Sequence, residues 1–478
     1  MILEREDRAA GSILLFCGKK GERIMAQTIA AVATAVAPAG VSMIRISGDE
    51  SLEVASRVFV PAGKKTLFDC KGYEALFGAV KQDGTVIDQA VALVFLAPHS
   101  YTGETVVEIS CHGGIYVTRA VLRAVLDNGA RLAEPGEFTK RAFLNGKLSL
   151  TQAEAVIDLI EAKTRDASKA ATSQLSGVLG KKISSVKDRL LKLAGHLSAW
   201  VDYPEDEIPE VDEEEIVYTA QTCYDEICTL LDTYDAGRLI REGIDTVIVG
   251  KPNVGKSTLM NTLARYERSI VTDIAGTTRD VVEESVRLGD LLLRLSDTAG
   301  IRETEDRVEQ IGVSIAKQRL AEASLILAVF DGSSDWSEED EELILMTKNR
   351  PAVAIVNKND LPAKTDMQKI QQSFDSIVEI SAKEETAAQS LEEAIRQKLS
   401  MEKIDPTAPM LANERQRSCA ATAKESLAGV LAAVRDGMTF DAVTVLVEEA
   451  IEAILALSGE RVTEAVVDQV FSNFCVGK

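Results

Sequence analysis

Histidine, proline and aromatic residues are scarce in this chain of 478 residues, which has three histidines, 11 prolines and 5% aromatics. Its seven cysteines are scattered and form no CxxC pair, so the sequence indicates neither a zinc site nor a disulfide framework. Free thiols suit a reducing cytoplasm. No apolar run reaches the roughly 18 residues that a membrane-spanning helix needs, which argues against a helical membrane protein.

Basic residues are outnumbered, with 53 lysines and arginines against 75 acidic residues and a net charge of −22. Such a chain does not attract nucleic acid through its overall field, so any contact with RNA has to be local or shared with a partner. A hydrophobic content of 46% and a charged content of 27% are typical of a globular protein. The length predicts about three domains.

The N-terminal segment allows more than one interpretation. Basic residues at 19–23 precede an alanine-rich run at 26–37, as in an export signal. However, Gln27, Thr28 and Thr34 interrupt that run. The alternatives are that residues 1–24 are an unassigned leader, or that translation begins at Met25.

Four segments with different patterns follow the N-terminal segment. Residues 25–145 predict a mixed α/β domain, with strands near 41–46 and 86–96 and a helix over 116–126. Residues 146–242 and 401–478 read as the two parts of one helical domain, apart from an acidic run at 204–215 that favours a solvated linker. Residues 243–400, between these parts, alternate strands with helices and predict an inserted α/β module.

The inserted module has the pattern of a largely parallel sheet. A hairpin at 281–288, turning through Gly289 and Asp290, is expected to add one antiparallel edge strand. The expected strands of the module lie at 246–249, 291–296, 325–330, 352–356 and 377–380.

The sequence GKPNVGKS at 250–257 matches the P-loop pattern GxxxxGK[ST], between a strand and a helix as that motif requires. Its backbone N–H groups would surround phosphate oxygens at the positive end of a helix dipole. Lys256 would reach the β- and γ-phosphates, and Ser257 would coordinate magnesium.

Three further motifs each end a predicted strand. In NKND at 357–360, Asp360 can accept the N1 and N2 protons of guanine, which adenine cannot offer. SAK at 381–383 fits the loop behind the base. DTAG at 297–300 can hold magnesium through water and sense the γ-phosphate. The four motifs in this order predict a guanine nucleotide site.

The residue after DTAG is Ile301, which cannot orient a water molecule, so the catalytic group has to lie elsewhere. With this isoleucine, TDIAGTTRD at 272–280 and FCVGK at 474–478, the chain resembles the MnmE (TrmE) family of tRNA-modification GTPases. The resemblance covers residues 26–478. Matches in the first domain are IRISG at 44–48, YTGE at 101–104, HGG at 112–114, PGEF at 135–138 and RAFLN at 141–145.

The resemblance implies how GTP is bound and cleaved. Magnesium would be held by Ser257 and Thr278, and Glu309 would take over the task of the missing glutamine. Potassium would be held by Asn253, Thr272, Ile274 and Thr277. The implied GTP-contacting residues are Asn253, Val254, Gly255, Lys256, Ser257, Thr258, Thr272, Asp273, Ile274, Ala275, Gly276, Thr277, Thr278, Asp297, Thr298, Ala299, Gly300, Asn357, Lys358, Asp360, Ser381, Ala382 and Lys383.

The resemblance also implies a first domain that mediates homodimerisation and binds a tetrahydrofolate derivative, 5-formyl- or methylene-tetrahydrofolate. The matching folate positions are Arg45, Glu108, Lys147 and Lys478, and Cys475 is implied as catalytic. The family works with the flavoprotein MnmG, which brings FAD and NADH. Together they place a carboxymethylaminomethyl or aminomethyl group on carbon 5 of the wobble uridine of certain tRNAs.

Some of these residues also have plainer interpretations. Glu309 can simply face solvent, Arg45 can cap a sheet edge, and a lone cysteine such as Cys475 is often a small buried hydrophobe. His112 is expected to be structural, because no second metal ligand accompanies it. The following basic residues can meet tRNA phosphates or can cover a helix surface: Lys181, Lys182, Lys187, Arg189 and Lys192.

The sequence therefore predicts a multidomain α/β and α fold, with an N-terminal α/β folate-binding-like domain, a discontinuous helical domain and an inserted Ras-like P-loop GTPase domain. The predicted function is that of a cytoplasmic GTPase without membrane contact, whose potassium-stimulated hydrolysis accompanies GTPase-domain dimerisation and drives tRNA modification. A regulatory or ribosome-assembly GTPase would share the nucleotide motifs but has no use for the first domain or FCVGK. A folate-binding protein whose GTPase is only a timer is the third hypothesis.

Overall fold

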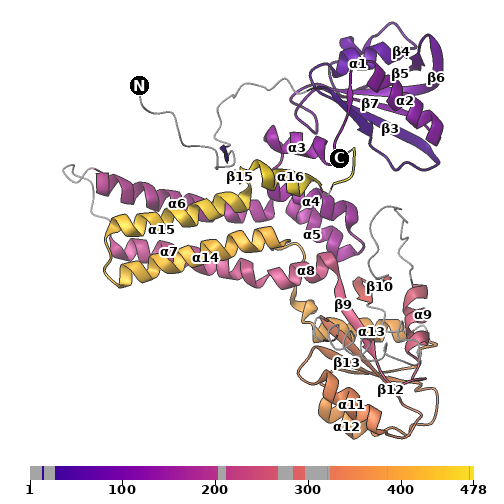
Figure 1. The fold of residues 1–478 in the computed structure, drawn as a ribbon, viewed down its shortest axis with the longest axis vertical. Coiled ribbons are helices and arrows are strands. Elements are labelled where there is room, and N and C mark those ends of the chain that lie inside the picture. Colours follow the sequence, from indigo (N-terminus) through magenta and orange to yellow (C-terminus); the bar gives the residue numbers. More distant parts are fainter. Residues whose placement is uncertain are drawn as a thin grey trace, which may run out of the picture. The chain divides into compact units, whose positions relative to one another are not determined.

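The computed structural model describes residues 13–15, 27–202, 212–266, 284–295, 320, 323–384, 386–472 and 474–477. The chain divides into two compact units, and Figure 1 labels most of their elements. Unit 1 contains residues 1–157, 175–227 and 418–478, and unit 2 contains residues 158–174 and 228–417. Among the helices within the described ranges, none is long and apolar enough to cross a membrane.

A seven-stranded sheet begins unit 1, in the order β4-β5-β6-β7-β3-β2-β8. Neighbouring strands are antiparallel except β2 and β8. Helices α1 (Ser51–Val58) and α2 (Ile115–Asp127) pack on one face, where alternate strand residues are buried, as the mixed α/β pattern predicted. The strands are β2 (Ile29–Val32), β3 (Ala39–Ser47), β4 (Phe59–Pro61), β5 (Glu74–Gln82), β6 (Thr85–Phe95), β7 (Val106–Gly113) and β8 (Arg131–Leu132), and a short 3-10 helix η1 (Leu67–Asp69) precedes β5.

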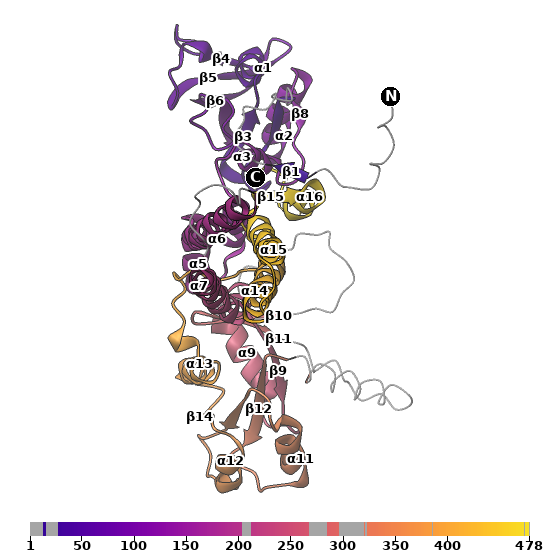
Figure 2. The same cartoon turned by 90° about the vertical axis from the view of Figure 1, so that its left-hand side faces the viewer.

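Long helices follow, as the helical spacing predicted. Helix α3 (Glu137–Leu144) leads to α4 (Leu150–Glu161), α5 (Arg165–Leu175) and α6 (Val178–Asp202). In unit 1, α6 packs against α15 (Phe440–Ser458). These two helices form a bundle with the greater parts of α7 (Glu213–Asp232) and α14 (Glu414–Arg435), seen nearly end-on in Figure 2. Buried residues recur at helical spacing along α6, which is why this face packs: Leu179, Ile183, Val186, Leu190, Leu193 and Leu197.

Two predictions for the helical part need correction. The stretch 204–215 is not a linker throughout, because α7 already begins at Glu213, with three glutamates at the positive end of its dipole. Residues 203–211 lie outside the described residues. The prediction that residues 401–478 are helical missed a short strand, β15 (Arg461–Thr463), which follows the left-handed Gly459 that ends α15. β15 pairs with β1 (Ile13–Leu15) and precedes α16 (Glu464–Ser472).

A six-stranded sheet forms the centre of unit 2, in the order β10-β11-β9-β12-β13-β14. Its strands are parallel except the edge strand β10, which forms the predicted hairpin with β11. The observed strands agree with the expected ones to within two residues at each described end. They are β9 (Ile244–Val249), β10 (Glu284–Leu288), β11 (Leu291–Leu295), β12 (Leu325–Asp331), β13 (Ala352–Asn357) and β14 (Ile377–Ile380).

Helices cover both faces of this second sheet. Residues of α9 (Lys256–Tyr266) and α13 (Thr386–Lys398) pack into the core on one face, together with Ile240 of α8 (Tyr234–Glu242). Residues of α11 (Glu338–Thr347) and α12 (Met367–Ser373) fill the core on the other, and a 3-10 helix η2 (Met401–Lys403) follows α13. A ligand site of such a sheet lies at the carboxyl ends of its strands. The predicted multidomain α/β and α fold, with an inserted P-loop domain, is confirmed.

Candidate nucleotide-binding site

The P-loop connects β9 to α9 through backbone conformations that only certain residues allow. A Cβ atom on Gly250 would lie 2.4 Å from the main-chain oxygen of Val329 on β12. Gly255 has a φ of +100°, and a Cβ there would lie 2.2 Å from Nδ2 of Asn357. Asn253 adopts a φ of +64°. The loop is therefore packed closely against the ends of two neighbouring strands, and both glycines are required by contact.

Lys256 is the first residue of α9, and its ammonium group lies inside the loop. Nζ donates to the main-chain oxygens of Gly250 at 2.6 Å and Lys251 at 2.9 Å. Burial lowers the pKa of Lys256, because the charged form loses solvent. Phosphate oxygens would stabilise the same charge, so this lysine is placed as a P-loop lysine needs to be.

Asn357 ends β13 and connects the P-loop to the SAK segment. It is buried, its Nδ2 donates to the oxygen of Val254 at 2.7 Å, and its Oδ1 accepts from the N–H of Ala382 at 2.9 Å. Thr262 on α9 donates from Oγ1 to the oxygen of Ala382 at 2.5 Å. Ser381 and Ala382 are buried, whereas Lys383 is exposed. The structure thus brings three of the four predicted motifs together at one edge of the sheet.

The side chain of Lys358 connects the NKND motif to the P-loop. Its Nζ donates to the oxygen of Asn253 at 2.9 Å and to Oδ2 of Asp331 at 2.5 Å. Burial alone would raise the pKa of Asp331, but hydrogen bonds from Lys358 and Ser333 outweigh it and lower the pKa. Asp360, two residues further on, is exposed, so its carboxylate is accessible to a ligand.

Some predicted site residues lie outside the described residues: Thr272, Asp273, Ile274, Ala275, Gly276, Thr277, Thr278, Asp297, Thr298, Ala299, Gly300, Glu309 and Lys478. Within the described part of the P-loop, Val254 is buried, while Ser257 and Thr258 are exposed in the first turn of α9. An exposed hydroxyl at this helix N-terminus is available to a phosphate-bound cation.

A second cluster lies in the first domain, where two of the predicted folate residues form an ion pair. Arg45 on β3 is paired with Glu108 on β7, and its Nε lies 2.8 Å from Oε1 of Glu108. The rings of Tyr101 and Phe138 lie within 5.7 and 5.6 Å of the Arg45 guanidinium carbon. The third predicted folate residue, Lys147, donates to the oxygen of Pro98 at 3.1 Å.

The C-terminal segment lies against this cluster. Nη1 of Arg45 donates to the oxygen of Gly477 at 3.4 Å, and Val476 forms a β-bridge with Pro135. Gly477 has a φ of +102°, and a Cβ on it would lie 2.2 Å from the oxygen of Val32. Cys475 is exposed, so it is not a buried hydrophobe. The FCVGK end therefore reaches the surface that carries Arg45.

Sequence reasoning missed several residues of both sites. Asp331 ends a fully buried apolar strand, and from that position a carboxylate can reach the neighbouring loops. An acidic residue at the end of a predicted apolar strand was therefore the sequence feature that could have indicated it. Tyr101 lies in a motif that was noted, but nothing in the sequence places its ring beside Arg45.

His112 pairs with Asp88 at 2.8 Å, in keeping with a structural role.

The basic set on α6 is partly neutralised within the protein. Lys182 and Arg189 both pair with Glu226 at 3.0 Å, and Lys187 pairs with Glu460 at 2.7 Å. Three of these five basic side chains thus already have acidic partners, which favours the interpretation as a helix surface over a phosphate-binding strip.

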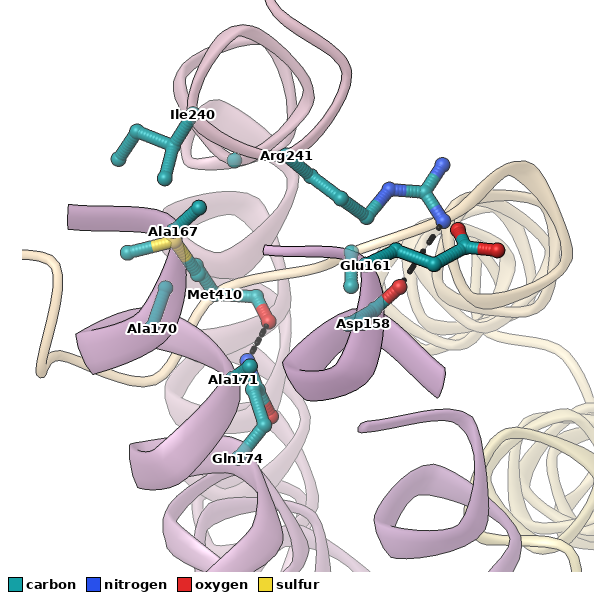
Figure 3. A pocket seen from close by; sticks show the side chains of 11 residues that line it. Asp158, Glu161, Ala167, Ala170, Ala171, Gln174, Ile240, Arg241 and Met410 are labelled. Carbon is teal, nitrogen blue, oxygen red and sulfur yellow. Dashed lines mark hydrogen bonds and ion pairs between the residues drawn. The ribbon is translucent and has the colours of Figure 1, made fainter. Parts of the chain in front are cut away.

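A separate small cavity of about 50 Å³ lies within unit 2, and none of its lining residues is a predicted site residue. Figure 3 shows that it is lined by residues of α4, α5 and α8 and by Met410. Gln174 donates to the oxygen of Met410, and Nη1 of Arg241 lies 3.6 Å from Asp158. Helix α8 continues through Gly243 into β9, so this cavity adjoins the segment that carries the P-loop strand.

A parallel sheet with helices on both faces, and with a P-loop, NKND and SAK joined at its carboxyl edge, defines a P-loop GTPase. The model of the MnmE helical domain matches residues 150–475, and the model of the GTP-binding protein TrmE N-terminus matches residues 28–147. The chain belongs to the MnmE family of tRNA modification GTPases, which confirms the predicted resemblance.

Relatives match along nearly the whole chain. The tRNA modification GTPase MnmE of Thermoanaerobacter pseudethanolicus is 41% identical over 460 residues, covering 94% of this chain and 99% of the relative. That of Clostridioides difficile is 39% identical over 454 residues, with the same coverage. A crystal structure of Era with MgGDPNP and a 16S ribosomal RNA fragment is 30% identical over 38% of this chain and 66% of Era, at a TM-score of 0.26, too low to support a conclusion.

Proposed function

We propose that this chain binds and hydrolyses GTP, and that hydrolysis drives modification of carbon 5 of the wobble uridine in certain tRNAs. This chain would carry out the modification together with the flavoprotein MnmG. The group installed would be a carboxymethylaminomethyl or aminomethyl group. One observation carries the proposal: the same chain holds a P-loop, an NKND motif and a SAK segment joined by Asn357, and a family-matched first domain. A GTPase that acted only as a switch would have no use for that first domain.

The donor groups around the P-loop fit the cations that the family resemblance implies. Asn253 presents an exposed side chain within the phosphate-binding loop, and its main-chain oxygen already accepts a hydrogen bond from Lys358. The amide oxygen of Asn253 would contribute to a potassium site, and the hydroxyl of Ser257 would bind magnesium. These cations would stabilise the negative charge that develops on the phosphate oxygens. Lys256 adds a fixed ammonium on the same side.

The remaining assignments in the GTPase domain follow the resemblance. Thr272, Ile274 and Thr277 would complete the potassium site, and Thr278 would complete the magnesium shell. Glu309 would act on the attacking water in place of a glutamine. Hydrolysis would then be linked to contact between the GTPase domains of a homodimer.

The Arg45 cluster, which consists of Arg45, Glu108, Tyr101 and Phe138, is the proposed site for a tetrahydrofolate derivative. A carboxylate such as Glu108 accepts hydrogen bonds from the amino edge of a pterin, and the two rings offer faces for stacking. The cations of Lys147 and Lys478 suit the glutamate tail. Cys475, exposed near this cluster, is the proposed nucleophile or acid–base group of the FCVGK end.

Analysis of tRNA nucleosides tests the proposal most directly. Cells that lack this chain are expected to lose the wobble-uridine modification, and the unmodified gene is expected to restore it. Restoration by a Lys256→Ala variant would show that GTP cleavage is not needed and would favour a GTPase that serves only as a timer. Unchanged nucleosides in the deletion strain would favour a regulatory or ribosome-assembly GTPase. We place the reaction in the cytoplasm, where free thiols such as that of Cys475 stay reduced.

A further inference from the structure

The P-loop is connected to α11 by a buried ion pair that no nucleotide motif includes. Lys251 occupies a variable position of the P-loop pattern, directly after Gly250. Its Nζ lies 2.7 Å from Oδ2 of Asp340 and 3.3 Å from Oγ of Ser337. The side chains of Lys251 and Asp340 are 13% and 3% exposed. Their interaction is therefore screened little by solvent.

Capping of α11 does not by itself explain the lysine. Oδ2 of Asp340 accepts from the N–H of Ser337 at 3.0 Å, and the side chain of Ser337 accepts in turn from the N–H of Asp340, so the two residues form a complete capping box. Oδ2 also accepts from the Ser337 hydroxyl at 2.9 Å. Such a box satisfies the helix N-terminus without any cation. Burying an ammonium group costs desolvation free energy, so a buried lysine added to a finished cap needs a further reason.

That reason lies in the backbone of the same residue. The main-chain oxygen of Lys251 accepts a 2.9 Å hydrogen bond from Nζ of Lys256, and the preceding oxygen of Gly250 accepts one of 2.6 Å. The Gly250–Lys251 segment therefore holds the ammonium group that is to meet the phosphates. The side chain of Lys251, tied to Asp340, fixes this segment against β12 and α11.

We propose that Lys251 and Asp340 are positioning residues that act through Lys256. Their largely buried pair keeps the oxygens of Gly250 and Lys251 in place, so that the Lys256 ammonium group lies beside the position of the β- and γ-phosphates before the nucleotide arrives. Preorganised charge of this kind needs no rearrangement when GTP binds. The inference deepens the proposed function, because it rests on GTP being the ligand of this P-loop.

Displacement of a fluorescent GDP analogue by GTP and by GMP from the full-length chain tests the inference. GMP lacks the β- and γ-phosphates, so the ratio of the two dissociation constants, GMP to GTP, reports contacts made by Lys256. In Lys251→Met and in Asp340→Asn this ratio is expected to fall about tenfold, the effect of losing one well-placed charged hydrogen bond. In the double variant the ratio is expected to fall no further, because both changes break the same ion pair. Lys251→Arg, which retains a cation, is expected to recover most of the ratio.

The control is Lys369→Met, which removes an exposed ion pair with Glu341, the residue next to Asp340. It is expected to leave the ratio unchanged. If Lys251 had a purely structural role, its replacement would weaken the binding of GTP and of GMP by the same factor. The ratio would then stay unchanged, which would overturn the inference. The double variant buries no lone charge, so it keeps the test usable if a single variant unfolds. Failure of the unmodified chain to bind GTP would instead overturn the proposed function.

Discussion

Asn357 donates a 2.7 Å hydrogen bond from its side-chain amide to the main-chain oxygen of Val254, 103 residues earlier in the chain. The other end of the same amide accepts from the N–H of Ala382 at 2.9 Å. One buried side chain thus ties the P-loop to the SAK segment, which we propose to lie behind the base. The two halves of the nucleotide site cannot be arranged independently.

Replacing this side chain is expected to damage stability and binding together. Asn357→Ala leaves the oxygen of Val254 and the N–H of Ala382 without their partner, at a cost of about 1–3 kcal/mol for each buried group. Urea unfolding should show the loss of stability, and displacement of a fluorescent GDP analogue should show weaker binding. Asn359→Ala, at an exposed neighbouring position, is the matched control. Unchanged stability in Asn357→Ala would contradict the role of the amide.

The choice of base is expected to depend on Asp360. Asp360→Asn places an amide donor where the N1 and N2 protons of guanine already donate. The affinity for GTP should fall and the affinity for xanthosine triphosphate should rise, as measured by competition. If GTP binding is undiminished, Asp360 does not contact the base.

The monovalent cation is expected to control the rate of hydrolysis. If the amide oxygen of Asn253 holds potassium beside the phosphates, phosphate release should be much faster in potassium chloride than in sodium chloride at equal ionic strength. Asn253→Ala should abolish this difference and largely keep nucleotide affinity. Glu309→Ala should slow hydrolysis in both salts while potassium still promotes contact between GTPase domains. Equal rates in the two salts for the unmodified chain would defeat this mechanism.

Folate binding is expected to depend on the ion pair in the first domain. Arg45→Ala and Glu108→Gln should each weaken binding of 5-formyl-tetrahydrofolate about tenfold or more, since each removes a charged partner that is largely buried. Calorimetry on the intact chain measures this effect. Lys65→Ala, which removes the exposed pair with Glu74, is the control and should bind normally. If the Arg45 and Glu108 variants bind as tightly as the control, the pocket lies elsewhere, and the GTPase assignment is unaffected.

Local patterns were sufficient to predict the second sheet. Its parallel strands are buried on both faces, so they read as short apolar runs ended by turn residues, and Ile377–Ile380 was predicted to the residue. The P-loop, NKND and SAK motifs could also be recognised in the sequence, because each is a contiguous stretch whose backbone conformation depends on its own residues. Their meeting at one sheet edge follows from the parallel arrangement.

Long-range pairings were not predictable in the same way. Nothing in the sequence couples Lys251 to Asp340, or Lys187 to Glu460, because such pairs depend on which faces of distant elements pack together. Strand β15 was missed for a related reason. Three residues are too few for a periodicity, and their pairing partner, Ile13–Leu15, lies at the other end of the chain.

The bond between Arg45 and Gly477 has a consequence for the order in which the protein matures. The two residues are separated by 432 positions, so the ribosome completes the first domain long before it synthesises the segment that lies against Arg45. The Arg45 cluster can therefore take its final form only after Gly477 has been synthesised and has left the exit tunnel. A chain that terminates before Gly477 would present a first domain whose Arg45 cluster lacks this contact.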